Sequence, residues 1–249
     1  MPQAHPLPPL PWLSPGDAFA PVHTAWGDDT PYPGLLCAGG ALDLTTLDRA
    51  YRQGIFPWFG AGQPVLWWST APRLVLDPQR FRLHRSLRKT LRSGLASERL
   101  RVRFDHATPQ VIEACAHTPR PRQHGTWIVP AMVQAYQAWH RAGAVHSVET
   151  YLDGTLVGGL YAVRLGGMVF GESMFSHRSD ASKIALAALV AWARRHKIAL
   201  IDCQQATAHL MTLGAHAMTR DDFVQHVAQA VQRPTAPWVF DPEDWAFLY

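Results

Sequence analysis

The stretch from Val145 to Cys203 most constrains the fold of this chain, because its turn signals separate a definite succession of elements. Asp153-Gly154 is typical of a tight hairpin turn between β-prone runs, and Gly166-Gly167 marks a second turn. The elements expected are strands over 145–152, 155–164 and 168–172, a helix over 181–196 and a buried strand over 198–203. This order predicts a mixed α/β (α+β) fold.

Helices and a division into domains are expected around this region. An Asp43 cap and Gly54 bracket a predicted helix over 44–53. Further helices are predicted over 85–95, 109–116, 130–142 and 220–232. Residues 1–15 are dense in proline and predict an irregular arm. We expect a small N-terminal domain over 1–71 and a larger domain over 72–249.

The buried strand at 198–203 ends in polar residues. Because side chains alternate along a strand, Asp202 and Gln204 are expected on one face and Cys203 on the other. A carboxylate and an amide in this place are costly to desolvate unless they bind something. They either cap the strand end through a structural hydrogen bond or belong to a site, and the spacing alone allows both.

The cysteines and histidines argue against metal chemistry. Cys37, Cys115 and Cys203 have no metal-ligand spacing, and the thirteen histidines form no HExxH pattern. No metal or cofactor is therefore expected, and three unpaired cysteines predict a reducing, cytoplasmic setting. Neither a membrane-length apolar run nor a signal peptide is recognised. A rival interpretation makes Cys203 an acyl-enzyme nucleophile with His209 or His216, although a free cysteine is commonly buried.

A run of basic residues suggests an anionic partner. The net charge is only +4, yet no acidic residue lies between Arg80 and Arg92. On a helix, the spacing i, i+3, i+4 and i+7 aligns four cations on one face: Arg85, Arg88, Lys89 and Arg92. These like charges repel unless an anion such as a nucleic-acid phosphate joins them. An ordinary solvated helix is the alternative.

A series of sequence blocks resembles the leucyl/phenylalanyl-tRNA–protein transferases. The blocks occur in the family's order over roughly residues 34 to 223: 51–59 (YRQGIFPWF), 66–69 (LWWS), 125–128 (GTWI), 146–149 with 157–161, 170–176 (FGESMFS), 180–186 and 200–204 (LIDCQ). The resemblance implies a GNAT-like acyltransferase core in the larger domain. It further implies transfer of Leu or Phe, with Met as a further candidate, from aminoacyl-tRNA to the N-terminal Arg or Lys of a protein. The product would carry a destabilising N-terminus that marks it for N-degron degradation.

The same resemblance implies the site residues. Gln204 would hold or help deprotonate the acceptor amine, Asp202 would orient Gln204, and Glu172 would bind a cationic amino group. Whether Asp202 and Gln204 act as a proton relay or as a clamp stays open. Four aromatic residues are implied at the terminal adenosine: Trp58 and Trp127 stacked on the adenine, with Tyr51 and Tyr136 nearby.

An apolar pocket for the transferred side chain is also implied. Its residues are Leu160, Val169, Met174, Leu186, Leu189 and Ile201. Any core between a sheet and a helix has this composition, so their assignment rests on the resemblance. The basic helix face would contact tRNA phosphates.

Two other classes of function are compatible with parts of the sequence. A GNAT-type small-molecule N-acetyltransferase would need a glycine-rich pyrophosphate loop, but the corresponding stretch, 175–181, has no glycine and carries Asp180. A non-catalytic tRNA-binding module would need the basic helix face but neither Asp202 nor Gln204.

Overall fold

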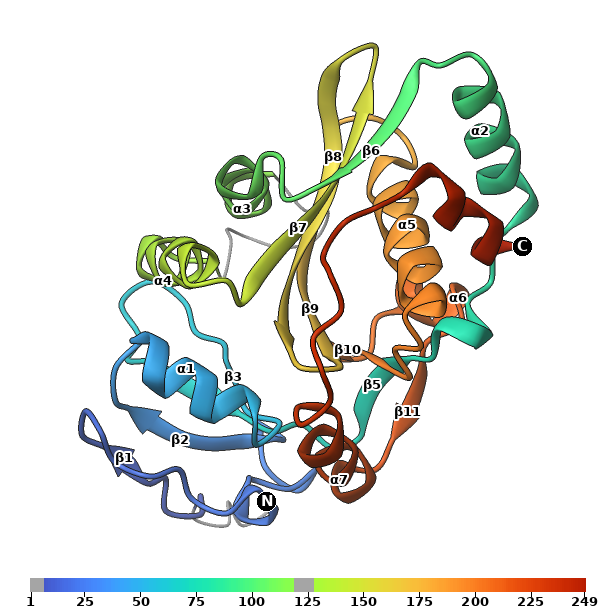
Figure 1. Cartoon of the computed structure of the whole chain (residues 1–249). Helices are drawn as coiled ribbons and strands as arrows, with labels where there is room; N and C mark the ends of the chain where they lie inside the picture. Colours follow the sequence, from blue (N-terminus) through green and yellow to red (C-terminus); the bar gives the residue numbers. More distant parts are fainter. Residues whose placement is uncertain (1–6, 119–127) are drawn as a thin grey trace, which may run out of the picture.

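The computed structural model describes residues 7–118 and 128–249, whose strands form two sheets (Figure 1). The smaller sheet has the order β1-β2-β4-β3, with β1 and β2 parallel and the other neighbours antiparallel. Its strands are Trp12–Leu13, Leu35–Gly39, Phe56–Pro57 and Leu66–Trp68 for β1 to β4. The prediction of an irregular arm over 1–15 is therefore wrong at β1, because backbone pairing with β2 orders that stretch; residues 1–6 lie outside the described residues.

The larger sheet has seven strands in the order β11-β5-β10-β9-β8-β7-β6. Its centre is the predicted meander: β7 (Val145–Leu152), β8 (Thr155–Leu165) and β9 (Met168–Ser176), all antiparallel. β10 (Ile201–Gln204) pairs in parallel with β9. Antiparallel strands complete both edges: β5 (Arg73–Leu76), β6 (Leu100–Phe104) and β11 (His216–Met218).

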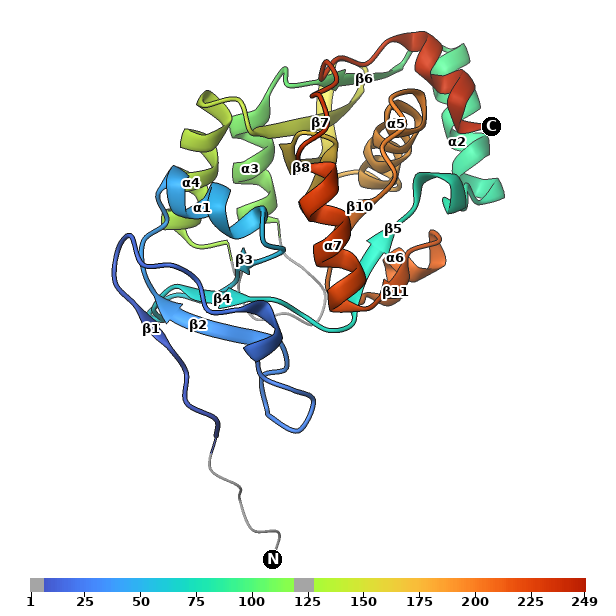
Figure 2. The same ribbon diagram turned by 60° about the horizontal axis from the view of Figure 1, so that its bottom comes forward.

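Helices cover both faces of this sheet (Figures 1 and 2). α5 (Ala181–Arg195) packs on one face, and α3 (Thr108–His117) and α4 (Pro130–Arg141) pack on the other. The remaining helical elements are η1 (Val22–Thr24), α1 (Leu44–Tyr51), η2 (Pro78–Arg80), α2 (Arg85–Ala96), α6 (Ala208–Thr212), α7 (Arg220–Ala230) and η3 (Pro242–Leu248). The expected mixed α/β class is thus confirmed.

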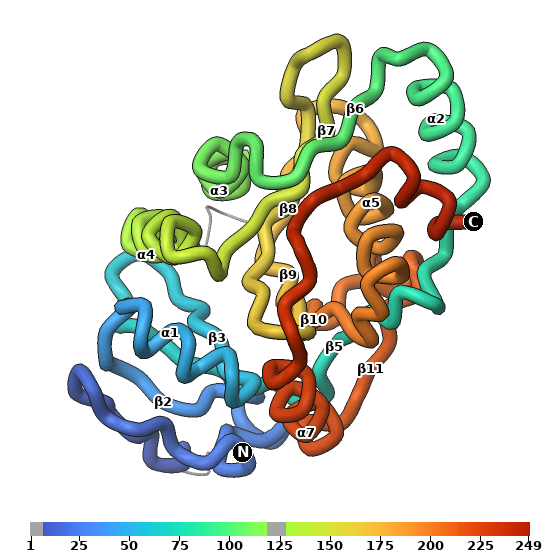
Figure 3. Tube along the Cα trace, in the orientation of Figure 1, coloured from blue at the N-terminus to red at the C-terminus, as the bar shows by residue number. Residues whose placement is uncertain are grey.

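The predicted helices agree with the structure to within a few residues. α1 begins where the Asp43 carboxylate accepts the Thr46 backbone N–H at 2.8 Å, and Gly54, with φ +72°, follows its end. The strands fit less well, because β9 runs on to Ser176 and β10 begins only at Ile201. β5, β6 and β11 were not predicted. The division into domains at residue 71 stays a prediction; the chain passes from the smaller to the larger sheet between β4 and β5 (Figure 3).

Two hydrophobic clusters stabilise the molecule. One cluster contains residues of the smaller sheet and of α1, together with residues of α3, α4, α7 and the larger sheet. The other surrounds α5, which is apolar on nearly every side because β7, β8 and β9 cover one face and η3 covers another. Among the described helices, none combines the length and apolar character needed to cross a lipid bilayer.

Candidate functional site

Two β-bulges lie side by side where β9 and β10 stop pairing. The β8–β9 register steps from Tyr161 opposite Ser173 to Ala162 opposite Gly171, so Glu172 is the extra residue. On β10, the pairing with β5 skips Cys203, and Gln204 adopts φ +52°. Bulges redirect side chains and are frequent beside active sites. The regular alternation assumed for residues 202–204 is therefore interrupted at Cys203.

The Glu172 carboxylate lies at the centre of a polar cluster built from four elements. Tyr51 of α1 is 2.7 Å from Oε1, and Tyr136 of α4 is 3.2 Å from Oε2. The two tyrosine hydroxyls are 2.6 Å apart. Gln204 of β10 donates from Nε2 to Glu172 Oε1 at 3.4 Å. The structure thus brings together Glu172 and Gln204, two of the three predicted catalytic residues.

The surroundings of Glu172 favour its neutral form. The pKa of its carboxyl is raised to about 8, chiefly by burial and also by the nearby Asp202, while hydrogen bonds with the tyrosines and the charge of Arg73 act in the opposite direction. Glu172 as a whole residue is partly exposed. A group titrating near neutral pH can take up or release a proton during a reaction.

Asp202 has no solvent-exposed surface and is paired with Arg73, which the sequence analysis missed. Arg73 Nε donates to Asp202 Oδ1 at 2.8 Å and a terminal nitrogen donates to Oδ2 at 2.6 Å. Asp202 Oδ1 also accepts the backbone N–H of Gln204 at 2.9 Å. Asp202 therefore orients Gln204 through the backbone, while its carboxylate is held by Arg73. The sequence signal that could have indicated this buried ion pair is the lone arginine at the start of the apolar run Leu74-Val75-Leu76.

Of the four aromatic residues assigned to the adenosine, the two tyrosines lie in the interior of the protein. Tyr51 and Tyr136 are fully buried, with their rings against Trp139 and their hydroxyls at Glu172. Trp58 is half-buried and lies 5.2 Å from the Trp68 ring. Trp127 lies outside the described residues. Stacking by Trp58 and Trp127 stays a prediction.

The six predicted pocket residues all belong to the hydrophobic cluster around α5. Leu160, Val169, Leu186, Leu189 and Ile201 are buried in it, and Met174 packs against it while partly exposed. Their use as an aminoacyl pocket stays a prediction. Cys203 also packs against this cluster, and burial raises the pKa of its thiol. A raised thiol pKa disfavours the thiolate that nucleophilic catalysis needs.

The predicted basic face is present on α2. Leu87 and Leu91 are its buried side, and the four cations line an open hollow of about 530 Å³ together with Leu83. The guanidinium groups of Arg88 and Arg92 lie 5.7 and 5.4 Å from the centre of the Tyr249 ring. None of the described residues that line this hollow is acidic.

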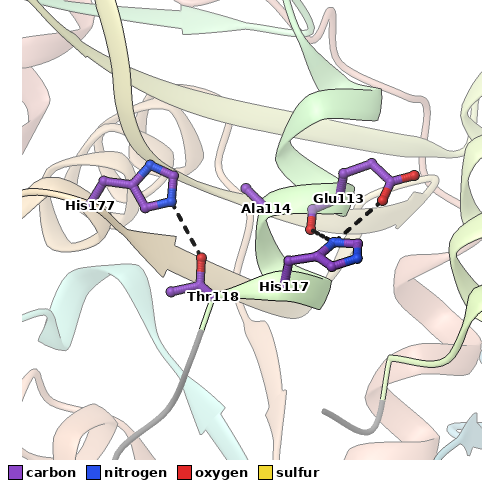
Figure 4. A pocket seen from close by; sticks show the side chains of 5 residues that line it. All are labelled: Glu113, Ala114, His117, Thr118 and His177. Carbon is purple, nitrogen blue, oxygen red and sulfur yellow. Dashed lines mark hydrogen bonds and ion pairs between the residues drawn. The ribbon is translucent and has the colours of Figure 1, made fainter. Parts of the chain in front are cut away.

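A second hollow lies at the end of α3, and the described residues that line it include none of the predicted site residues (Figure 4). It measures about 350 Å³ and is lined by Glu113, Ala114, His117, Thr118 and His177. His117 is 3.6 Å from the Glu113 carboxylate, and Thr118 is 3.5 Å from His177. Within residues 7–118 and 128–249, no three His, Cys, Asp or Glu side chains are grouped closely enough to hold a metal ion.

Most of the chain matches one family of known proteins. Residues 75–228 match the model of the leucyl/phenylalanyl-tRNA protein transferase family, and residues 40–71 match that of its N-terminal domain. A leucyl/phenylalanyl-tRNA–protein transferase of Polaromonas sp. is 60% identical over 237 residues, covering 95% of this chain and 93% of the relative. One of Leptothrix cholodnii is 55% identical over 244 residues, covering 96% and 95%.

Among solved structures, a conserved protein of unknown function from Staphylococcus epidermidis has 11% identity and a TM-score of 0.38, covering 74% of this chain and 68% of that one.

The sequence matches define an aminoacyltransferase. The chain belongs to the leucyl/phenylalanyl-tRNA protein transferase family. The sequence-based expectation of an enzyme that uses aminoacyl-tRNA and a protein N-terminus is therefore confirmed.

Proposed function

We propose that this enzyme moves Leu or Phe, with Met as a further candidate, from aminoacyl-tRNA to the N-terminal Arg or Lys of proteins. The product then carries a destabilising N-terminus for N-degron degradation. The observation that carries the proposal is the Glu172–Gln204 pair at the two bulges, beside the apolar cluster around α5. An amide and a titratable carboxyl suit an amine acceptor, and an apolar neighbourhood suits a Leu or Phe donor.

The reaction needs little chemistry from the protein, because the aminoacyl ester is already activated. An α-amine has an ordinary pKa of roughly 7.7–8.0, so part of it is neutral near pH 7. Once the ammonium has released a proton, its nitrogen attacks the ester carbonyl carbon. The new C–N bond forms, the C–O bond to the ribose breaks, and the ribose oxygen takes up the second amine proton. Holding amine and ester together can supply roughly 7–11 kcal/mol of the barrier reduction.

The site residues then have different tasks. The Gln204 amide oxygen accepts a hydrogen bond from the acceptor amine, and Glu172 in its ionised form receives the first proton or binds the cation. Both Asp202 oxygens are bonded to Arg73, which supports a clamp over a proton relay for Asp202. Trp58 and Trp127 stack on the terminal adenine. The basic face of α2 neutralises phosphates of the tRNA.

We also infer a GNAT-like core in residues 72–249 and a separate small domain in residues 1–71. The succession of β7, β8, β9, α5 and β10, with β10 parallel to β9, supports the first of these. A cytoplasmic location follows from the substrates, since the proposed donor is a charged tRNA.

The residues at the N-terminus of α5 fit an N-acetyltransferase less well. There the Ser182 backbone N–H donates to the Ser176 hydroxyl at 3.1 Å, and Asp180, with φ +65°, holds Lys183 at 2.8 Å. An acyl-CoA pyrophosphate would need free N–H groups at this helix terminus and no carboxylate beside them.

The proposal is tested by incubating the protein with labelled Leu-tRNA and a peptide that begins with Arg. Label should pass to the peptide, and ribonuclease treatment beforehand should abolish the transfer. A peptide that begins with Ala is the matched control. Gln204→Ala should lose transfer while still binding tRNA, which also separates the enzyme from a non-catalytic tRNA-binding module. Equal labelling of both peptides would contradict the proposed acceptor preference.

A further inference from the structure

Arg73 is one of the least exposed charged residues of the molecule, and its guanidinium contacts three separate parts of the chain. It is 1% exposed on β5 and binds both oxygens of Asp202 on β10. Its remaining terminal nitrogen donates to the Gly54 carbonyl, just past α1, at 3.3 Å. The rings of Phe56 on β3 and Phe223 on α7 lie 4.6 and 4.5 Å from its central carbon.

These contacts reach both halves of the Glu172 cluster. Through Asp202, Arg73 fixes the backbone N–H of Gln204, whose positive φ is unusual for a residue with a side chain. Through Gly54, it fixes the turn after α1, where the Gly54 N–H donates to the Tyr51 carbonyl at 3.0 Å. Tyr51 and Gln204 both contact Glu172 Oε1. Hydrogen bonds through Asp202 and Gly54 therefore link one cation to both residues that contact Glu172 Oε1.

Stability alone is a poor reason to keep such a pair. A buried ion pair loses so much hydration that apolar residues of similar volume often stabilise a protein as well or better. A planar guanidinium in bidentate contact with a carboxylate does, however, fix the direction of that carboxylate. Lysine carries the same charge but cannot make this two-point contact.

We propose that Arg73 is a positioning residue for aminoacyl transfer: through Asp202 and Gly54 it sets the placement of Gln204 relative to Glu172 and Tyr51. This inference rests on the proposed function. It assigns Arg73 no contact with either substrate. The charged and titratable groups at Glu172 are Tyr51, Tyr136, Asp202 and Arg73 itself.

The test compares Arg73→Lys, Arg73→Gln and wild type in the transfer assay, with rates referred to the folded fraction measured by circular dichroism. For Arg73→Lys we expect kcat to fall by about 10–100-fold, because a displacement near 1 Å at a reacting group has this effect. The KM for Leu-tRNA should change by less than about twofold, since Arg73 makes no contact with the bound tRNA in this proposal. Arg73→Gln also removes a charge that lowers the pKa of Glu172, so its pH–rate profile should move to higher pH, whereas that of Arg73→Lys should not.

Arg195→Lys is the matched control, because Arg195 also binds a fully buried aspartate, Asp244, at 2.6 Å but lies at the end of α5. It should keep the wild-type kcat. If Arg73→Lys does not fold, Phe223→Leu takes its place: it removes one ring from the guanidinium and should lower kcat with KM unchanged.

Two results would overturn the inference. One is wild-type kcat per folded molecule in Arg73→Lys or its substitute, and the other is an equal loss in Arg195→Lys. An inactive wild type would instead contradict the proposed function, so the two failures are distinguishable.

Discussion

At the scale of single residues, the protons around Glu172 can be counted. Three close oxygen pairs join Glu172, Tyr51 and Tyr136, and each needs one hydrogen between its oxygens. Two tyrosine hydroxyls supply two. A protonated Glu172 supplies the third, which agrees with the raised pKa of this carboxyl. These contacts favour a neutral Glu172 when no substrate is bound, and the arrival of a cationic acceptor favours release of its proton.

This proton gives stability a definite dependence on pH. The pKa of Glu172 is about 8 in the folded protein against 4.5 in a free side chain, so between these values the folded state holds a proton that the unfolded chain has released. The contribution is complete below pH 4.5 and is lost as pH rises through 8. We expect the wild-type unfolding free energy to fall relative to Glu172→Gln by less than about 1.4 kcal/mol per pH unit. Denaturant unfolding of both proteins from pH 5.5 to 7.5 checks this; parallel curves would contradict it.

The adenine contact is tested at the same scale. Trp58→Ala and Trp127→Ala should each raise the KM for Leu-tRNA much more than the KM for the acceptor peptide, because a stacked base is worth about 1–3 kcal/mol. The two KM values and the melting temperature are measured together. Equal changes in both KM values, with a lower melting temperature, would show that the tryptophan serves core packing.

At the scale of elements, local signals in the sequence predicted local structure. The Asp153-Gly154 hairpin and the Asp43 cap depend on neighbours along the chain, and both appear as expected. β5 depends on β10 and β11, more than a hundred residues away, so its four residues carry no sufficient signal of their own. The bulges at Glu172 and Cys203, and the pairing of Arg73 with Asp202, depend on the same distant contacts. The sequence therefore suggested candidate site residues, but it could not supply the geometry that joins them.

The function of the basic face of α2 can be tested separately from the other elements. Replacing Arg85 and Lys89 by Ala should weaken tRNA binding and reduce the salt slope of log K by about 0.7–0.9 for each phosphate that the variant no longer neutralises. Binding titrations at several salt concentrations measure the slope. Arg99→Ala is the control, because that exposed guanidinium is already paired with Asp153 at 2.6 Å. An unchanged slope in the α2 variant would remove tRNA phosphate as the partner of this face.

At the scale of the whole molecule, one hydrophobic cluster spans the residues on both sides of position 71. Tyr51 and Trp67 belong to it together with Tyr136, Phe170 and Phe223. We therefore expect a single cooperative unfolding transition, with tryptophan fluorescence and far-ultraviolet circular dichroism changing at the same denaturant concentration. Separate transitions would mean that the two predicted domains fold independently.

The cover over α5 has a consequence for how the chain is made. α5 is complete at Arg195, but the residues that cover its outer face, Trp238 and Leu248 among them, are synthesised only later. β5 likewise has no partner strand until β10 and β11 have been synthesised. A ribosome-bound chain therefore carries an unpaired strand until β10 is made, and an apolar helix face until the residues that cover α5 are made. Such surfaces are the ones that aggregate or recruit chaperones. For this protein, the yield of folded molecules should therefore depend on the residues that cover α5, Trp238 and Leu248 among them.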